Sequence, residues 1–342
     1  MPCPVQEGRL GDVINHGYAS TTDRFCFGVV RLDSRPCGSL TLVACRNPTV
    51  NQPSSVSGKP KVYVDCYPLE YFVQRIAGNL VEVKFPAPAD VDPAFWQPTA
   101  DQVAEYQAAD LILINGAGYA RWVEYASLPP SRVEVTSAAF QSDYLRLPDA
   151  VVHKHGPQGE HAHQGWASHT WLDPRQARQQ AAAVRDALKR LLPDRQAELQ
   201  QNWELLDRDL AQWQTALERY ATPPKRKMFA SHPVYDYLAR FCGWELRSFH
   251  WEPNEMPDEE EWNRFQEVVK EHPARWMLWE DEPLPRIVDQ LARHQVQPIV
   301  FYVCGNRPSS GDFLTVMQQN VQRLSVLAEE SVSGQQVPVD SE

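Results

Sequence analysis

The stretch that decides the fold is KVYVDCYPLEYFVQRIAG, which occupies residues 61–78. Its start, Lys61 to Asp65, is rich in β-branched and aromatic side chains, a composition typical of a strand. From Tyr67 onward the apolar residues follow helical spacing, at positions 69, 72, 73 and 76, and the pattern stops at Gly78. The stretch therefore predicts a strand followed directly by a helix.

The same alternation recurs on both sides of a long helical segment. We expect further strands at 81–85, 111–114, 227–230, 245–249, 276–279 and 298–303. Helices are expected at 99–109, 234–241, 259–270, 284–294 and 311–330. Residues 173–221 carry leucines at heptad-like intervals and predict one long or kinked helix, interrupted at Pro193. Strands that alternate with helices form parallel sheets, so the predicted fold class is α/β, with two βα lobes joined by a long bridging helix.

The composition also divides the chain into segments. The first 55 residues show no sustained periodicity and end in a linker with Pro, Ser and Gly, so we expect a disordered leader there. An N-terminal lobe is expected over 56–172, with a His-rich loop at 153–165. The bridging helix at 173–221 is followed by a C-terminal lobe over 222–332 and a disordered tail over 333–342.

The leader contains a match to the bacterial lipoprotein cleavage pattern. Residues 42–45 read LVAC, and in that pattern the cysteine, here Cys45, is lipid-modified and begins the mature chain. The apolar stretch before it is short and contains Ser39 and Thr41, whereas a secretory signal has ~7 to 15 apolar residues after a basic start. A lipid anchor at Cys45 and a chance match in a disordered leader both stay open.

Length and charge exclude several classes of function. At 342 residues the chain exceeds the ~250 to 300 residues at which single cores stop growing, which favours two lobes. The net charge of −11 argues against nucleic acid as a partner, because phosphate binding needs a basic face. The sequence has no run of ~18 apolar residues, so no helix is expected to span a membrane.

Histidines are concentrated in one part of the sequence. His153, His155, His161 and His163 lie among glycines and a proline, a composition that favours a mobile loop over a fixed cage. Imidazole is a common ligand for zinc, copper and nickel, so the cluster indicates metal binding, although an incidental polar loop has the same composition. His169 differs because it lies just before an Asp-Pro pair that favours a helix start, which places it beside a rigid element.

Several motifs, in order along the chain, carry a resemblance to a known family. They are Tyr67-Pro68-Leu69 with Ile76-Ala77-Gly78, Asp92-Pro93 with Pro98-Thr99, Ala109-Asp110-Leu111, the His-rich loop, Ser168 to Pro174 (SHTWLDP), and Ser231-His232 with Tyr235. Over residues of about 60–330 the chain resembles the substrate-binding proteins of zinc and manganese ABC transporters. Members of that family capture a transition metal between two α/β lobes.

The resemblance implies a set of metal ligands. His169 matches the family's second histidine. His232 matches the third ligand, which is histidine in zinc members and typically glutamate in manganese members. Glu280 matches a glutamate that some zinc members use as the fourth ligand, and its neighbours Asp281 and Glu282 are alternatives to it. The identity of His232 favours zinc over manganese.

The chain departs from the family at the first ligand. Where the family usually has a histidine after Asp-Pro, this chain has Ala94, so one coordinating nitrogen is missing. Zinc prefers four ligands in a tetrahedron, and three protein ligands leave one position open. Water or a histidine of the His-rich loop is left to fill it, with His153, His155, His161 and His163 as auxiliary ligands. Two histidines and a carboxylate suit zinc better than magnesium or calcium, while copper and nickel would also bind in vitro.

The resemblance implies a solute-binding protein outside the cytoplasm, not an enzyme. It would capture Zn²⁺, ahead of Mn²⁺, and deliver it to an ABC transporter permease. We expect a periplasmic or cell-surface monomer that contacts the membrane only through a lipid anchor at Cys45. Two alternatives stay open: a degenerate member that binds another ligand or metal, and a zinc hydrolase, which uses a similar ligand set. The HExxH, GxSxG and P-loop motifs of hydrolases are absent from the sequence.

Three cysteines remain in the part expected to fold, namely Cys66, Cys242 and Cys304. An odd number cannot all pair within one chain, and the spacing does not fix their connectivity. Cys304 follows the last predicted strand, near the position at which manganese members carry an aspartate ligand. A buried thiol, a disulfide between Cys242 and Cys304, and a thiolate contact with the metal stay open.

Overall fold

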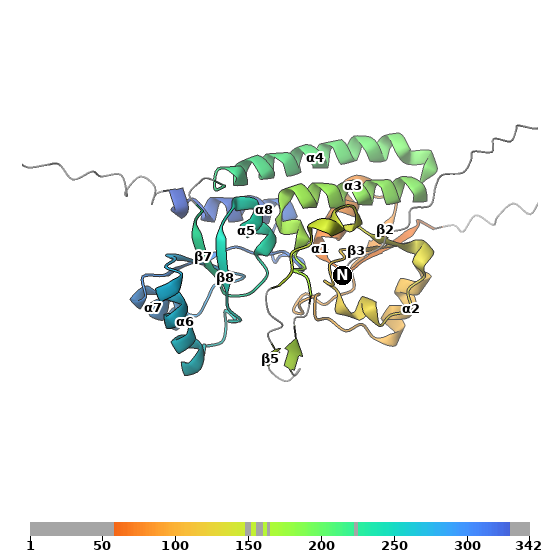
Figure 1. Cartoon of the computed structure of the whole chain (residues 1–342). Helices are drawn as coiled ribbons and strands as arrows, with labels where there is room; N and C mark the ends of the chain where they lie inside the picture. Colours follow the sequence, from red (N-terminus) through yellow and green to blue (C-terminus); the bar gives the residue numbers. More distant parts are fainter. Residues whose placement is uncertain (1–57, 148–151, 155–159, 163–164, 222–224, 329–342) are drawn as a thin grey trace, which may run out of the picture. The chain divides into compact units, whose positions relative to one another are not determined.

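The computed structural model describes residues 58–147, 152–154, 160–162, 165–221 and 225–328. These residues form two four-stranded sheets, one two-stranded sheet and the helices that connect the strands (Figure 1). The predicted α/β fold class is confirmed. The leader with Cys45, the tail from 333 to 342, and His155 and His163 lie outside the described residues.

The first parallel sheet begins with the strand that opened the sequence analysis. Its strands are β1 (Lys61–Val64), β2 (Glu82–Lys84), β3 (Leu111–Ile114) and β4 (Val133–Val135), in the order β2-β1-β3-β4. All pairings are parallel, and Tyr63 of β1 lies opposite Ile112 of β3. Every residue of β3 is buried, because a parallel sheet is covered on both faces and accommodates continuous apolar runs.

The second parallel sheet repeats this arrangement. Its strands are β7 (Lys227–Ala230), β8 (Glu245–Ser248), β9 (Trp276–Trp279) and β10 (Gln297–Val300), in the order β10-β9-β7-β8. All of its pairings are parallel as well. In both sheets the first strand in chain order lies between the second and the third. The direction of winding therefore reverses between the first and third strands, and ligands bind at this point in many open α/β sheets.

Helices connect the strands and cover the sheets. They are α1 (Tyr67–Ala77), α2 (Ala100–Ala108), α5 (Asp236–Cys242), α6 (Glu259–Glu271), α7 (Pro285–Arg293) and α8 (Phe313–Arg323). Short 3-10 helices are η1 (Arg121–Glu124), η2 (Pro130–Arg132), η3 (Ala138–Asp143) and η5 (Thr170–Leu172). At the start of α2, the side chains of Thr99 and Gln102 each accept a hydrogen bond from the other's backbone N–H. This capping box satisfies two N–H groups that the helix leaves without partners.

The long helical segment differs from its prediction. Instead of one long or kinked helix, the structure has α3 (Pro174–Leu191) and α4 (Gln196–Glu218), separated by the 3-10 turn η6 (Pro193–Arg195). Pro193 has no backbone N–H to continue the helix, and it disfavours the helical region for the residue before it. Leu192 accordingly leaves the helix, at φ −125° and ψ 67°. The chain folds back at this point.

The helices α3 and α4 lie side by side and run antiparallel (Figure 1). Arg178, near the start of α3, donates hydrogen bonds of 2.7 and 2.9 Å to Asp207 in the middle of α4. Near the end of α3, Nζ of Lys189 donates a hydrogen bond of 2.6 Å to Oε1 of Gln200, near the start of α4. α4 also packs against α1, which follows β1, and against α8, which follows β10. A helical hairpin, rather than a single helix, connects the two sheets.

Part of the His-rich segment forms a two-stranded antiparallel ribbon where a loop was expected. It consists of β5 (Val152–Lys154) and β6 (Glu160–Ala162). His153 and His161 occupy opposite positions in this pairing. The backbones of two predicted auxiliary ligands are therefore paired directly across the ribbon.

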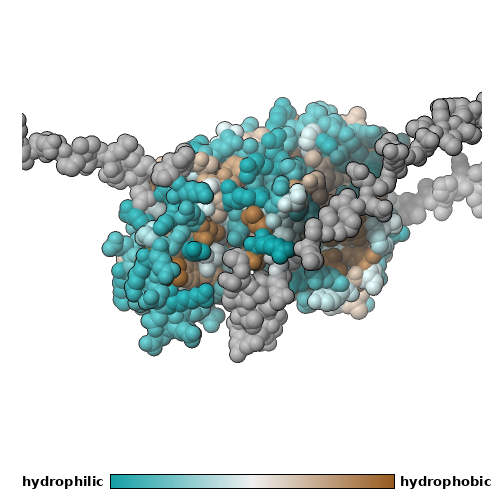
Figure 2. Space-filling view, in the orientation of Figure 1, coloured by the Kyte–Doolittle hydropathy of each residue, from teal (hydrophilic) through white to brown (hydrophobic). Residues whose placement is uncertain are grey.

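The surface is mostly polar. The face drawn in Figure 2 is predominantly hydrophilic, in keeping with the net charge of −11. Large hydrophobic side chains with high exposure are few among the described residues: Tyr125, Trp166, Leu205 and Met256. No helix in the described part of the chain is long and apolar enough to cross a membrane.

Candidate metal centre

Side chains suited to metal binding follow three adjacent strands of the second sheet. His232 follows β7, Glu252 follows β8, and Glu280 directly follows β9. Because parallel strands end at the same edge of a sheet, the loops that carry these residues lie together. β7 and β9 are the first and third strands in chain order, so His232 and Glu280 occupy the point at which the winding reverses.

His232 lies close to two carboxylates. Its Nδ1 atom is 3.8 Å from Oε1 of Glu280 and also 3.8 Å from Oε1 of Glu252. Zinc bonds of ~2.0 Å in a tetrahedron place neighbouring donor atoms ~3.3 Å apart. Each of the two distances from His232 is thus about 0.5 Å longer than the spacing of neighbouring donor atoms around a zinc ion. The ring of His250 approaches His232 edge-on, with the ring centroids 5.5 Å apart.

Backbone hydrogen bonds fix the loops that carry these side chains. The N–H of Ser231 donates to the carbonyl of Leu278 in β9 at 2.8 Å. The carbonyl of Ser231 accepts a bond of 2.8 Å from the N–H of Trp251, in the loop after β8. The residue before His232 is therefore tied to both neighbouring segments, which limits movement of the histidine relative to Glu252 and Glu280.

Three carboxyl groups repel one another in this region. Burial, followed by the negative charges of Asp92 and Glu252, raises the pKa of Glu280 to about 8, although 30% of its side chain remains exposed. Burial among protein atoms also raises the pKa of Asp92, with a smaller contribution from Glu252, although Asp92 stays accessible to water. A bound cation would offset the repulsion and displace the proton from Glu280. The electrostatics of the site therefore favour a divalent cation.

Asp92 belongs to the loop after β2, in the first sheet. Its Oδ1 atom accepts a hydrogen bond of 2.9 Å from the N–H of Ala94. Ala94 itself is buried. From the loop after β10, the side chain of Asn306 donates to the carbonyls of Pro88 at 2.6 Å and Val91 at 2.8 Å. The segment with the unusual alanine is thus held directly against the second sheet.

His169 lies beside the first sheet, immediately before η5, and is buried. Its ring packs edge-on against Tyr119, with centroids 5.4 Å apart, and at 5.1 Å against Trp171. The indole N–H of Trp171 donates a bond of 2.8 Å to the carbonyl of Val303, after β10. Rigid aromatic side chains that reach the second sheet therefore set the position of His169.

A buried hydrogen-bond network supports the loop that carries His169. The amide of Asn115 donates to the carbonyl of Ser168 at 2.9 Å. Its Oδ1 atom accepts bonds from the hydroxyl of Thr170 at 2.7 Å and the amide of Gln180 at 2.9 Å. Asn115 thus fixes the backbone before His169 and the side chain after it.

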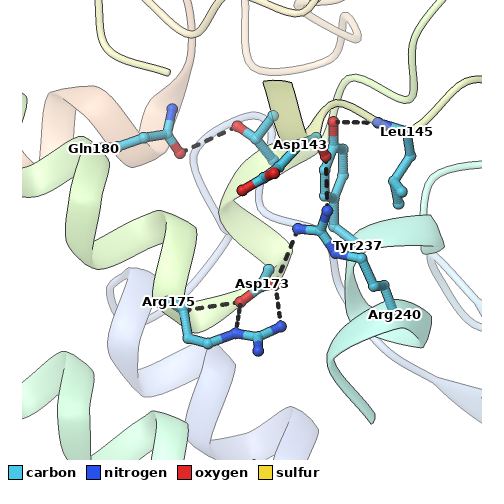
Figure 3. A network of polar contacts seen from close by, with 8 residues as sticks. Asp143, Leu145, Asp173, Arg175, Gln180, Tyr237 and Arg240 are labelled. Atoms are coloured by element: carbon cyan, nitrogen blue, oxygen red, sulfur yellow. Dashed lines mark hydrogen bonds and ion pairs between the residues drawn. The ribbon is translucent and has the colours of Figure 1, made fainter. Parts of the chain in front are cut away.

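Arg240 of α5 connects the segments that follow the two predicted histidine ligands (Figure 3). Its guanidinium donates to the carbonyl of Asp143 at 2.7 Å and to Oδ2 of Asp173 at 3.2 Å. Asp173 is buried, caps the start of α3 by accepting from the N–H of Arg175, and also pairs with the Arg175 guanidinium. The helix that follows His169 is thereby joined to the helix that follows His232.

The structure brings only part of the predicted ligand set together. His232 and Glu280 are neighbours, but in the described part of the chain no group of three His, Cys, Asp or Glu side chains has the geometry to hold a metal ion. Tyr119 contacts His169 and is also affected by the charges of nearby carboxylates. Its ring packs on His169, and burial, followed by the charges of Asp92 and other acidic groups that include Glu280, raises the pKa of its phenol. Of the predicted ligands, His232 and Glu280 thus lie close together, and whether His169 shares an ion with them stays a prediction.

Asp281, a predicted alternative to Glu280, makes local contacts. Its carboxylate accepts a hydrogen bond of 2.8 Å from the N–H of Glu282. After burial, the charge of Asp281 is the next largest factor that raises the pKa of Tyr302. These observations place Asp281 in contact with its own turn and near Tyr302, and its role as a metal ligand stays a prediction.

The three cysteines are buried and not joined by disulfides. The disulfide between Cys242 and Cys304, one of the open alternatives, is therefore not formed. Burial, with a contribution from the charge of Asp312, raises the pKa of Cys304 to about 12. A thiolate at this position is unfavourable, so the structure assigns Cys304 to the buried thiols.

Sequence reasoning missed Asp92 and Glu252 as members of the site. Asp92 entered only as part of an Asp-Pro motif, and Glu252 was not considered. One signal was available, because both residues follow predicted strands in a chain of alternating strands and helices. Polar residues at the carboxyl ends of such strands are candidates for ligand contacts.

Two parallel α/β sheets, with imidazole and carboxylate groups beyond the ends of their strands, define a binding protein with donor groups suited to a transition metal. The chain belongs to the ZnuA family, described as zinc-uptake complex component A periplasmic, whose model matches residues 62–326. The resemblance found in the sequence is confirmed.

Individual relatives are distant. The zinc-binding lipoprotein AdcA of Streptococcus pneumoniae is 23% identical over 298 residues, which cover 84% of this chain and 58% of AdcA. The zinc uptake protein ZnuA of Bacillus subtilis is 24% identical over 261 residues, covering 74% of this chain and 81% of that protein. The zinc-bound ZnuA-like domain of S. pneumoniae AdcA has a similar fold, with a TM-score of 0.66 and 20% identity over 79% of this chain and 98% of the domain. The chain thus spans little more than half the length of AdcA.

Proposed function

We propose that this chain is a solute-binding protein that captures Zn²⁺ outside the cytoplasm and delivers it to an ABC permease. Membership of a family of zinc-uptake components supports this function, as do relatives named for zinc binding and zinc uptake. The observation that carries the proposal is the position of His232, 3.8 Å from each of two carboxylates where the winding of the second sheet reverses. A transport component, rather than a zinc hydrolase, accounts for these findings.

The proposed ligands of the transported ion are His169, His232 and Glu280. Imidazole and carboxylate donors suit zinc, and the two histidines favour it over Mn²⁺, which prefers oxygen ligands. The side chain of Ala94 has no donor atom, so these three ligands leave the ion one short of the four that zinc prefers. The His-rich segment, 153–165, is proposed to raise the local concentration of metal.

The proposed location is the periplasm or the cell surface. The family description includes the word periplasmic, and one relative is named a lipoprotein, which supports a lipid anchor at Cys45. We propose that the protein acts as a monomer, with the metal ion and the permease as its partners.

Metal titration of the full chain tests the proposal. The metal-stripped protein is titrated with Zn²⁺, Mn²⁺ and Cu²⁺ against a competing chelator, and bound metal is counted by elemental analysis. We expect one zinc per chain, and an affinity that falls by ~100-fold in His232→Ala, because even indirect partners of metal ligands contribute 10- to 100-fold. His294→Ala is the matched control, since His294 packs on Phe265 elsewhere in the same sheet region. No stoichiometric metal on a cooperatively folded protein would instead identify a degenerate family member.

A further inference from the structure

Glu252 and Glu280 stand in the same relation to His232. Each places its Oε1 atom 3.8 Å from Nδ1 of the histidine. Glu280 was expected from the family to be a ligand, whereas no expectation attached to Glu252. The geometry around His232 does not distinguish the two carboxylates.

The loop that carries Glu252 is well anchored. The N–H of Phe249 donates to the carbonyl of Ala230 at 2.9 Å, and the N–H of Leu284 donates to the carbonyl of Pro253 at 2.9 Å. Trp251 is buried and stacks on Phe249, with ring centroids 5.0 Å apart. Rigid neighbours on both sides hold Glu252 at this position, as a metal ligand requires.

A buried hydroxyl group also lies beside His169, the proposed ligand from the first sheet. The hydroxyl of Tyr119, whose ring packs on His169, is buried without a hydrogen-bond partner among the described residues. An imidazole nitrogen at the same distance from two carboxylates distinguishes this group from a purely acidic surface cluster.

Position 94 explains why an additional ligand is needed. Ala94 is buried and its side chain has no donor atom, while its N–H is used by Asp92. Zinc bound by three protein ligands would keep an open position, as in catalytic sites. Sites that hold zinc without chemistry are usually closed by a fourth protein ligand.

We propose that Glu252 is a metal ligand that replaces the histidine missing at position 94. This inference rests on the proposed capture of zinc at His232. The resulting site has two imidazoles, His169 and His232, and two carboxylates, Glu252 and Glu280. Because more of its donors are oxygen atoms, the site discriminates less strongly against Mn²⁺ than a site with three imidazoles.

Substitution of Glu252 in the full chain tests the inference. In Glu252→Gln we expect the affinity for Zn²⁺ to fall by at least ~10-fold, with one zinc still bound at saturation. Glu255→Gln is the matched control, since it makes the same change in the same loop at an exposed residue. Glu252→His should restore tight zinc binding and raise the ratio of zinc to manganese affinity. Thermal unfolding of the metal-free variants shows whether the fold is intact.

The outcomes separate this inference from the function on which it rests. If the unaltered chain binds no stoichiometric zinc, the proposed function fails. If the unaltered chain binds zinc and Glu252→Gln binds it equally well, only the role of Glu252 is overturned. A loss confined to Asp92→Asn would overturn that role too, because the additional ligand would then come from the first sheet.

Discussion

The two parallel sheets have the same strand order but use the point at which the winding reverses in opposite ways. In the first sheet this point carries Asp65 and Asn115, and both oxygens of Asp65 accept from the Asn115 N–H at 3.0 Å. Both residues are buried. In the second sheet it carries His232 and Glu280, which keep some exposure and lie 3.8 Å apart. One topology thus supports a closed polar network in one sheet and a candidate metal site in the other.

The strand order sets where polar groups gather at the strand ends, and the identity of the side chains there decides what they can bind. The first network is internally satisfied, since Asn115 also binds Ser168, Thr170 and Gln180. Satisfied buried networks make a structure rigid. The second group consists of mutually repelling carboxylates near an imidazole, an arrangement that a cation stabilises. The first sheet therefore positions the loop of His169, and the second supplies the other proposed ligands.

The largest expected effect is that of Asn115→Ala on stability. The substitution removes the side-chain partner of Ser168, Thr170 and Gln180, while the backbone N–H that bonds Asp65 is kept. Each buried group left unsatisfied costs about 1–3 kcal/mol. We expect the free energy of unfolding to fall by about 3–5 kcal/mol, measured by urea denaturation without metal. His232→Ala should show the reverse behaviour, with weak zinc binding and nearly unchanged stability. Equal stability losses in the two variants would contradict the contrast between the sheets.

The pH dependence of stability tests the buried acid of the first sheet. Burial raises the pKa of Asp65 from its ordinary value of 3.8 to about 7 in the folded protein. The folded state therefore holds a proton that the unfolded state releases, so this contribution is present below pH 4 and is lost as the pH rises through 7. The stability of the unaltered chain relative to Asp65→Asn should fall over this range by about 2–4 kcal/mol. A difference that stays constant across the range would show that Asp65 is not protonated when folded.

A smaller effect is expected for Arg240→Met, which breaks a connection between the two halves. The variant loses the bonds to Asp143 and Asp173, but Asp173 keeps its pairing with Arg175. We expect a loss of about 1–2 kcal/mol in unfolding free energy and a modest loss of zinc affinity, because both histidine loops adjoin this contact. Arg293→Met is a suitable control, since Arg293 is exposed and its guanidinium donates to Gln290 within α7. A normal affinity in Arg240→Met would show that the site does not depend on this connection.

The smallest effect is expected for Asp281→Asn. Its carboxylate caps the N–H of Glu282, and the amide oxygen of asparagine retains that bond. The zinc affinity should change by less than ~2-fold, compared with at least ~10-fold for Glu280→Gln. A large loss in Asp281→Asn would restore the alternative that the sequence left open, with Asp281 as a ligand.

Much of the fold was predictable because it depends on local patterns. The run from Lys61 to Gly78 forms β1 and α1 as expected, and the capping box at Thr99 begins α2. The hairpin of α3 and α4 was not predicted, although Pro193 marked its position. An interruption shows where a helix ends, but the return direction depends on pairs such as Arg178 with Asp207, which are distant in sequence.

The candidate site was predictable to a smaller extent. His232 and Glu280 were expected ligands and are neighbours, and whether His169 joins them on one ion stays a prediction. Asp92 and Glu252 were missed because the one signal for them, their place after predicted strands, does not show which loops meet in the folded protein. Their proximity to Glu280 arises only when separate loops meet beyond the strand ends.

By itself, the sequence determined the alternation of strands and helices, the family, the absence of a histidine at position 94 and the types of donor available. These properties follow from periodicity and residue identity, which act over a few neighbouring positions. Only the tertiary structure decided that Glu252 lies as close to His232 as Glu280 does. The physical reason is that coordination and charge repulsion act over a few ångströms in space, between residues that the chain separates by tens of positions.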